Sequence, residues 1–316
     1  MTEQAAGSSG KSFLIFLASL VVLVATGIGL GSVLFGPKAA RAYDRSTPDA
    51  VLEAAKQMVL NNEAERLSEL LYVDEPEMER VYDRLGSVLG HLQELAIAIN
   101  DRFPEEVAAM RAKAEEEAKA GRGVGLLQQL GSTVSSGRSR RGPPAAADEN
   151  RWNGVLQTIA SDPYSWLTEA EGRLSYVWID DERVAVLWDE KPVFPPFGLV
   201  MQQDRGQWTV VLPWKSIPMA SRFLPQTPDE YAIWGAVFQA VDNVVIDLTR
   251  DVNEGRLTSL ESLSRASGQK AAPVIAGCMI AYGKALEERR RRERAAREAA
   301  KEAASKPNGD GGTGGG

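Results

Sequence analysis

The chain has 316 residues, of which 44% are hydrophobic and 25% are charged, and its formal net charge at pH 7 is -7. This composition is typical of a globular protein, and the acidic balance argues against general nucleic-acid binding. The sequence contains one histidine, His91, and one cysteine, Cys278. One cysteine excludes a disulfide within the chain, and this pair cannot build a His/Cys zinc site, so we expect neither a metal nor a cofactor.

The N-terminal region predicts a membrane anchor. After a short tail, residues 1–11, no charged residue occurs between Lys11 and Lys38. As a helix, this apolar run would span roughly 34 Å, which is enough to cross a bilayer core. We expect a single-pass transmembrane helix at residues 12–37. A cleaved signal peptide is the alternative, because Ala40-Arg41-Ala42 resembles a cleavage site, but the apolar run exceeds the ~7–15 residues of a signal peptide.

The charges flanking this anchor leave its orientation open. Lys11 and the α-amino group precede the anchor, whereas Lys38, Arg41 and Arg45 follow it. The positive-inside rule applied to this count leans toward a cytoplasmic body. N-terminal anchors often leave the large domain outside the cytoplasm, however, and we expect an extracytoplasmic body.

Capping residues and apolar periodicity predict helices in the first half of the chain. Thr47-Pro48-Asp49 supplies an N-cap, a proline at the first helical position and an acid in the first turn. Asn61-Asn62 ends that helix, and a short second helix is expected up to Leu71. From Pro76 to Phe103 an apolar residue recurs every three to four positions, which predicts one long helix.

Two segments without an apolar stripe follow. Residues 105–120 are rich in Ala, Glu and Lys and predict an exposed helix. Residues 121–150 lose periodicity and are dominated by Gly, Ser, Pro and Ala, so we expect a flexible insertion there. A loop that binds a ligand or an anionic surface is the alternative.

Four runs of β-branched and aromatic residues predict an antiparallel sheet of about four strands. Asp180-Asp181-Glu182 and Asp204-Arg205-Gly206 predict turns, the second a three-residue hairpin with glycine at positive φ. Lys191-Pro192 and Pro195-Pro196 are expected to interrupt the middle connection, since proline cannot donate to a ladder. The strands are expected at Leu174–Ile179, Arg183–Trp188, Phe197–Gln202 and Gln207–Leu212.

Alternation along these strands predicts that both faces of the sheet carry apolar side chains. We expect the first face to be buried and helices to cover the second as well. The first face collects Leu174, Tyr176, Trp178, Val184, Val186, Trp188, Phe197, Leu199, Met201, Trp208, Val210 and Leu212. The second collects Val177, Ile179, Ala185, Leu187, Val200 and Val211.

The remainder of the chain predicts a C-terminal helical segment, residues 227–286. Thr227-Pro228-Asp229-Glu230 repeats the cap, with Glu230 placed for a capping box, and Asn253-Glu254-Gly255 ends that helix. A short helix around Leu260 and a last helix from Ala271 are expected next. Residues 287–316 predict a solvated charged helix followed by a disordered Gly-rich tail. Its arginines are alternatively a site for an anionic surface: Arg289, Arg290, Arg291, Arg292, Arg294 and Arg297.

Residues 47–216 resemble the NTF2-like (cystatin-like α+β cone) superfamily, in its membrane-anchored bacterial type. The resemblance rests on the capped Thr-Pro-Asp helix, the short second helix and the strands ending in Asp204-Arg205-Gly206-Gln207-Trp208. It implies an α+β fold with helices on a curved sheet and a conical pocket. Such folds include isomerases, hydrolases and non-catalytic binding modules. Candidate pocket residues are Asp74, Tyr82, Tyr164, Trp166, Tyr176, Trp178 and Trp188.

No catalytic motif occurs in the sequence, and His91 is expected to be a surface histidine beside Ser87 and Glu94. We therefore expect a membrane-anchored, non-catalytic binding or assembly module. It would act through its sheet face or its C-terminal helices on a second copy or another protein. The alternative is a small-molecule carrier or enzyme that uses the conical pocket.

Overall fold

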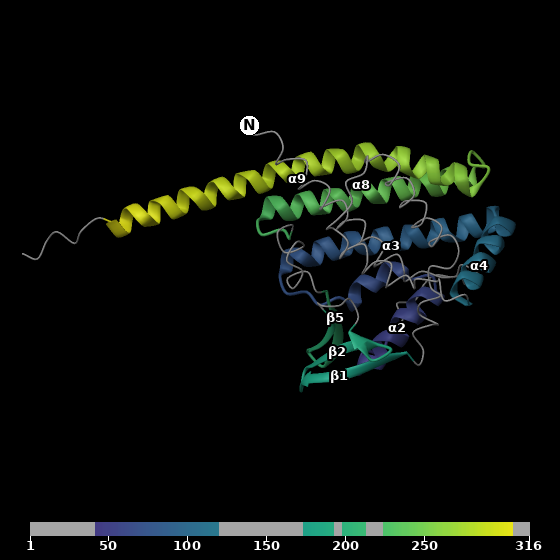
Figure 1. Ribbon diagram of the computed structural model, residues 1–316, viewed down its shortest axis with the longest axis horizontal. Helices are drawn as coiled ribbons and strands as arrows, with labels where there is room; N and C mark the ends of the chain where they lie inside the picture. The colour runs from purple at the N-terminus through teal and green to yellow at the C-terminus, as the bar shows by residue number, and fades with distance from the viewer. Residues whose placement is uncertain (1–41, 120–172, 193–197, 213–223, 306–316) are drawn as a thin grey trace, which may run out of the picture.

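The protein is an α+β structure in which a group of long helices lies on one side and a small antiparallel sheet on the other (Figure 1). The computed structural model describes residues 42–119, 173–192, 198–212 and 224–305. The predicted anchor at residues 12–37, the insertion at residues 121–150 and the Gly-rich tail lie outside these ranges.

The helices begin where capping chemistry predicts. Thr47 Oγ1 accepts a hydrogen bond from Ala50 N at 3.1 Å, and Thr227 Oγ1 accepts one from Glu230 N at 3.3 Å. Each threonine therefore satisfies one backbone donor that a helix start would leave unpaired. The helices are α2 (Pro48–Leu60), α3 (Pro76–Arg102), α4 (Pro104–Lys119), α8 (Pro228–Asn253) and α9 (Leu260–Ser305), with a 3₁₀ helix, η1 (Ala64–Leu70).

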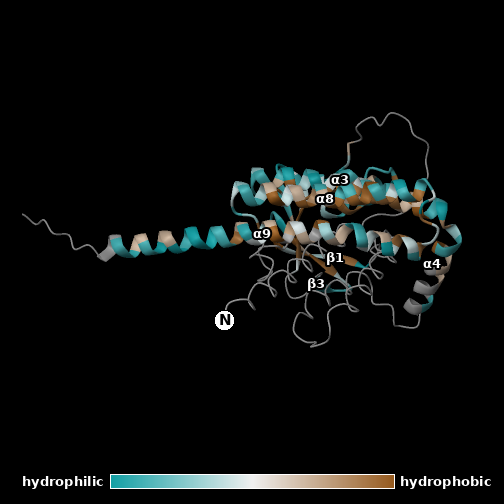
Figure 2. Ribbon diagram, turned by 90° about the horizontal axis from the view of Figure 1, so that it is seen from above, coloured by the Kyte–Doolittle hydropathy of each residue, from teal (hydrophilic) through white to brown (hydrophobic). Residues whose placement is uncertain are grey.

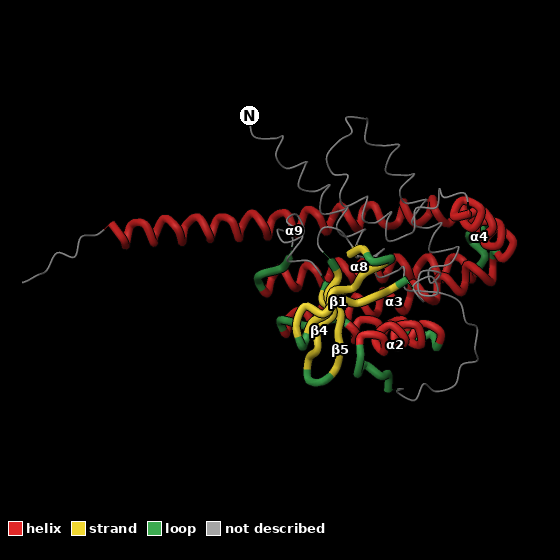
Figure 3. Tube along the Cα trace, turned by 60° about the horizontal axis from the view of Figure 1, so that its bottom comes forward, coloured by secondary structure: helices red, strands yellow, loops and turns green. Residues whose placement is uncertain are grey.

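The predicted strands are confirmed as one antiparallel sheet in the order β1-β2-β4-β5 (Figure 3). An additional strand, β3, pairs with the end of β2, so Lys191-Pro192 extends the sheet and does not interrupt it. Asp204 pairs with Gln207, which makes the last turn a two-residue turn and not the predicted three-residue one. The strands are β1 (Leu174–Asp180), β2 (Arg183–Trp188), β3 (Lys191–Pro192), β4 (Leu199–Asp204) and β5 (Gln207–Val211).

Two apolar clusters hold the fold together. The first, the helical core, joins both predicted segments, residues 47–216 and 227–286, because α3 packs against α8 and α8 packs against α9. Figure 2 shows that the facing sides of α3 and α8 are hydrophobic. The second, the sheet core, lies between α2 and the sheet. Each fully buried aliphatic side chain contributes about 1.5–3 kcal/mol of transfer free energy. The sheet core includes Val51, Ala54 and Met58 of α2 and Val184, Val186, Met201 and Trp208 of the sheet.

The described residues of the first face are buried or half-buried, as predicted, except Trp178. Val184, Met201 and Trp208 are almost fully buried under α2, whereas Trp178 is 60% exposed. On the second face, Val177 and Ile179 are each 52% exposed. The prediction that helices cover both faces is therefore wrong at β1.

The C-terminal helices differ from the prediction in one respect. The two helices expected around Leu260 and from Ala271 form a single 46-residue helix, α9, with Pro273 inside it. Its C-terminal half extends beyond α8 and α3 and is largely hydrophilic (Figures 1 and 2). In the described part of the chain one helix, α8, is long and apolar enough to cross a membrane by length and composition.

An ionic cluster closes the connection between α8 and α9. Asp251 contacts Lys270 Nζ at 2.8 Å and accepts a hydrogen bond from Arg256 Nε at 2.7 Å. Gly255 has φ of +70°, a conformation that glycine adopts without strain. The hydrogen bond from Lys270 lowers the pKa of Asp251, burial opposes this shift, and the hydrogen bond from Arg256 lowers the pKa further. The folded state therefore favours the ionised carboxylate.

Replacing Asp251 by asparagine is expected to lower the free energy of unfolding at pH 7 by about 1–3 kcal/mol, because charge-assisted hydrogen bonds are lost. The folded pKa is depressed, so this stabilisation is present above the unfolded pKa of about 3.9 and disappears as pH falls through the folded value. Urea unfolding of both proteins between pH 7 and pH 3 would measure it. Asp247→Asn, at a more exposed carboxylate that also contacts Lys270, is the control. A difference between Asp251→Asn and the parent that stays constant over this pH range would contradict the assignment.

Candidate functional site

The two outer strands of the sheet, β1 and β5, differ in what pairs with their outer edges. At β5, Trp208 N donates to Arg45 O at 2.7 Å and Tyr72 N donates to Val210 O at 2.9 Å. Leu71 also forms a parallel bridge with Val210. Segments from outside the sheet therefore occupy the edge of β5. Among the described residues no strand pairs with the outer edge of β1.

The outer edge of β1 has the polar groups that strand pairing requires. Asp189 N donates to Arg173 O at 2.9 Å, so Arg173 directs its backbone groups toward β2. Backbone groups alternate in direction along an antiparallel strand. Ser175 and Val177 therefore also direct their backbone groups toward β2, while Tyr176 directs its N–H and C=O groups outward. A bulge between Trp178 and Asp180 interrupts this alternation near the end of the strand. An exposed strand edge of this kind is a template for pairing with another chain.

Three consecutive apolar side chains lie at this edge. Val177, Trp178 and Ile179 are 52%, 60% and 52% exposed. Trp178 contacts Trp208 edge to face, with ring centroids 5.5 Å apart, which orients its indole at the rim of the sheet core. We define these three residues as the β1 patch. Adjacent exposed apolar residues on an edge strand are a liability unless a partner covers them.

Opposite charges lie at the two ends of β1. Arg173 precedes the strand, binds Asp189 through its guanidinium and stacks over Trp188 at 4.7 Å. Arg173 lowers the pKa of Asp189 by hydrogen bonding, so that carboxylate stays ionised. The last residue of the strand and the turn after it are three exposed acids, Asp180, Asp181 and Glu182, of which Asp180 binds Arg183. The edge is therefore apolar in the middle and acidic at the turn, while at the other end the charge of Arg173 is balanced by Asp189.

The candidate pocket residues do not form one cluster in the structure. Tyr176 and Trp188 are part of the sheet core, and Trp178 lies at its rim. Tyr82 is buried in the helical core, and Asp74 is exposed in the connection before α3. Burial raises the pKa of the Tyr176 phenol, and the nearby Asp49 carboxylate raises it further. Tyr164 and Trp166 lie outside the described residues.

His91 is not the simple surface residue that its spacing predicts. Its Nδ1 lies 2.6 Å from Oδ1 of Asp242, whose side chain is only 7% exposed. The pair links α3 to α8. Ser87, the hydroxyl one helical turn away, donates to the backbone oxygen of Asp83. We therefore assign the His91–Asp242 pair to helix packing. In the described ranges no group of three or more His, Cys, Asp or Glu side chains is arranged to hold a metal ion.

The arginines of the last helix are partly engaged by acids of the same chain. Arg289 pairs at 2.8 Å with Glu230, a carboxylate that is 1% exposed, and Arg291 pairs with Glu287 at 2.8 Å. Arg292 and Glu288 form a further ion pair. Pairs four residues apart are typical of a solvated charged helix. These contacts reduce the positive charge available to an anionic surface.

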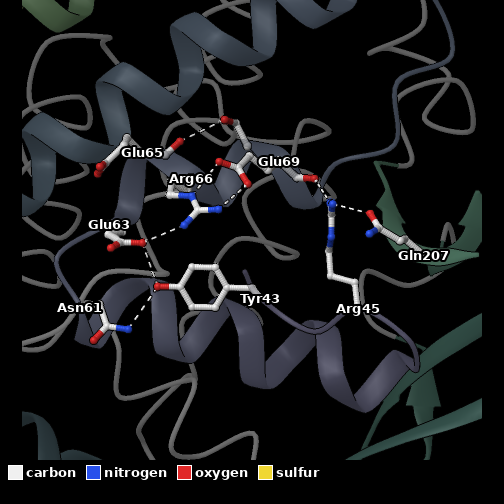
Figure 4. A network of polar contacts seen from close by, with 9 residues as sticks. Tyr43, Arg45, Asn61, Glu63, Glu65, Arg66, Glu69 and Gln207 are labelled. Atoms are coloured by element: carbon white, nitrogen blue, oxygen red, sulfur yellow. Dashed lines mark hydrogen bonds and ion pairs between the residues drawn. The ribbon is translucent and has the colours of Figure 1, made fainter. Parts of the chain in front are cut away.

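A polar network fixes the first described residues to the body (Figure 4). Tyr43 donates to Glu63 Oε2 at 2.9 Å and accepts from Asn61 Nδ2 at 3.1 Å. Arg66 lies over the Tyr43 ring at 4.8 Å and binds Glu63 at 3.0 Å. Arg45 donates to Glu69 O at 2.6 Å and also binds Gln207. The chain that follows the predicted anchor is thus held against α2, η1 and β5.

Comparison with protein-family models, with curated proteins and with solved structures finds no match to this chain. Fold and site therefore define a class only, an α+β protein with a helical core, a sheet core and one apolar sheet edge.

Proposed function

We propose that this protein is a membrane-anchored, non-catalytic assembly module that binds a protein partner through the outer edge of β1. The observation that carries the proposal is the exposure of the β1 patch beside outward-pointing backbone groups. Strand addition at such an edge supplies main-chain hydrogen bonds for affinity and covers side chains for specificity. The occupied edge of β5 supports the choice, because the fold leaves β1 as the edge without a described partner strand.

The packing of the sheet core favours a function in protein binding over one in which a small molecule occupies a conical pocket. In the conical arrangement implied by the NTF2-like resemblance, a pocket would lie between the helices and the concave face of the sheet. Here that face is packed against Val51, Ala54 and Met58 of α2. The exposed apolar surface lies instead at the outer strand, where it is accessible to a macromolecule.

The proposed anchor would hold this edge close to a bilayer. If residues 12–37 cross the membrane, the connection to Tyr43 is residues 38–42, which reach at most about 18 Å when extended. The Tyr43–Arg66 network then fixes the body to that connection. Confinement near a surface raises the effective concentration of partners, so a modest edge interaction is sufficient for assembly. We place the body on the extracytoplasmic side.

A photoreactive phenylalanine analogue at position 178 of the full chain, in its native membrane, tests the proposal. We expect a discrete crosslinked protein species. The same analogue at position 280 is the matched control, because Ile280 is 63% exposed on α9, away from the sheet. Adding Val177→Lys to the position-178 protein should reduce the crosslinked species by at least about tenfold, because a charge would be buried in the interface.

Two results would count against this function. One is equal crosslinking at positions 178 and 280, which would show random collision in the membrane. The other is crosslinking at position 178 that Val177→Lys leaves unchanged, which would show that the neighbouring side chain is not in the interface.

A further inference from the structure

We infer that a basic stripe on the projecting half of α9 binds the surface of an anionic lipid bilayer. The stripe consists of Arg290, Arg294, Arg297 and Lys301, whose side chains are all exposed. Their spacings of four, three and four residues place them within an arc of about 60° on one side of the helix. The inference uses the membrane anchor of the proposed function and does not depend on the β1 edge.

The stripe keeps its charge because the acids nearby engage other arginines. Arg289, Arg291 and Arg292 form the ion pairs described above. Glu293 contacts Arg289 at 3.9 Å, and Glu298 lies further round the helix than the stripe. In the described part of the chain none of the four stripe residues forms an ion pair. Their positive charge is therefore available to a partner.

The projecting helix carries the stripe away from the acidic body. Arg289 pairs with Glu230, near the start of α8, so the residues that follow run past the end of that helix (Figure 1). Lys301 lies about 18 Å beyond this ion pair along α9. The chain as a whole has a formal net charge of -7, which an anionic surface would repel. Because charges are screened over about 8 Å at physiological salt, the outer part of the stripe escapes much of this repulsion.

The composition of the projecting helix favours a lipid surface over a macromolecule. Residues 287–305 contain Arg, Lys, Glu, Ala and one Ser, with no aromatic residue and no aliphatic side chain larger than that of alanine. Protein interfaces depend on buried aromatic, arginine and large apolar anchors, and sites for single-stranded nucleic acid depend on aromatic stacking. Clusters of basic residues near a membrane segment bind anionic headgroups through charge. The proposed anchor would supply the second attachment that stable membrane binding requires.

Quenching by lipid headgroups tests the inference. In the full chain with Cys278→Ala, a fluorophore is attached to Ala300→Cys, at an exposed position next to Lys301. The protein is reconstituted into bilayers of phosphatidylcholine, alone or mixed with phosphatidylglycerol, and both bilayers carry a lipid with a spin-labelled headgroup. We expect quenching in the mixed bilayer only. High salt should reverse it, because exposed charges are screened.

Two double variants separate the stripe from the net charge. Arg294→Gln with Arg297→Gln removes two stripe charges and should lower the ratio of bound to free helix on the mixed bilayer by about thirtyfold. Arg291→Gln with Arg292→Gln removes the same charge from arginines that are already paired with acids, and it should have an effect of less than about threefold. Equal effects of the two double variants would overturn the inference.

Other results would also overturn it. One is quenching that is the same with and without phosphatidylglycerol. Another is binding of a single-stranded oligonucleotide that the Arg294→Gln/Arg297→Gln variant loses, without quenching in the mixed bilayer, which would assign the stripe to nucleic acid.

The same variants distinguish the stripe from the anchor and from the β1 edge. If the chain does not stay with phosphatidylcholine bilayers, the anchor is absent, but the stripe should still sediment the chain with phosphatidylglycerol vesicles. Failure to sediment with these vesicles would then overturn the inference. Crosslinking at position 178 should be unchanged in both double variants, so failure of the stripe leaves the proposed function standing.

Discussion

Replacing Gly86 by alanine is expected to destabilise the protein by about 2–3 kcal/mol, as overpacking of a close contact does. Gly86 lies in the middle of α3, where it packs against η1. A Cβ at this position would lie 2.5 Å from the backbone oxygen of Glu65 and 2.6 Å from Oγ of Ser68. Ser68 donates to that same oxygen at 3.0 Å, so its hydroxyl cannot rotate away from the added methyl group without losing this hydrogen bond.

Gly235→Ala in α8 is the matched control for this prediction. Apart from its chain neighbours and the backbone of its own helix, no atom of the described residues lies within 4 Å of the Cβ that would be added there. Alanine should stabilise that helix by about 0.5–1 kcal/mol, because glycine costs conformational entropy inside helices. Urea unfolding of the two variants should therefore give changes of opposite sign. A Gly86→Ala protein as stable as the parent would show that α3 and η1 are not in close contact.

Local signals in the sequence account for much of the fold. The strands follow from β-branched alternation, and both Thr-Pro-Asp caps form as predicted, because each depends on residues only a few positions apart. Features with longer-range causes were predicted less well. The Lys191-Pro192 strand depends on Asp189 and Glu190 adopting positive φ, a conformation that aspartate tolerates but glutamate does not favour. Sequence alone does not indicate that turn.

Contacts between distant segments could not be predicted at all. His91 and Asp242 are 151 positions apart, and no local pattern marks the aspartate as the partner. The spacing of Gly86 and Gly90 on one face of α3 is a signal that was available. Small residues four positions apart permit close approach of another backbone, which is what η1 makes there.

The β1 patch shows what alternation along a strand cannot predict. Alternation correctly places Trp178 on the apolar first face and Val177 on the second. It cannot show that β1 is an outer strand, because strand order depends on pairing between distant segments. Burial of Val184 at 0% and exposure of Trp178 at 60% therefore arise from similar sequence patterns. The difference between core and interface is set by position in the sheet.

Glu230→Ala is expected to cost about 3–5 kcal/mol, because breaking a buried ion pair leaves the partner charge uncompensated. Oε2 of Glu230 accepts from Gln226 N at 2.8 Å and binds Arg289 at 2.8 Å. This differs from the predicted capping box, in which the carboxylate would bind the backbone of Thr227. The carboxylate instead joins the start of α8 to the last packed turn of α9, next to buried Tyr282 and Leu286.

Two variants isolate this effect. Asp229→Ala, one residue earlier and exposed, removes a charge from the same helix start and should cost less than about 1 kcal/mol. Glu230→Met combined with Arg289→Met replaces the pair by apolar side chains, and this double variant should be more stable than Glu230→Ala. Hydrogen exchange should show lost protection around Tyr282 in Glu230→Ala while α3 stays protected. If Glu230→Ala were no more destabilising than Asp229→Ala, the pair would not hold α9 to α8, and the apolar contacts of Tyr282 and Leu286 alone would fix the helix.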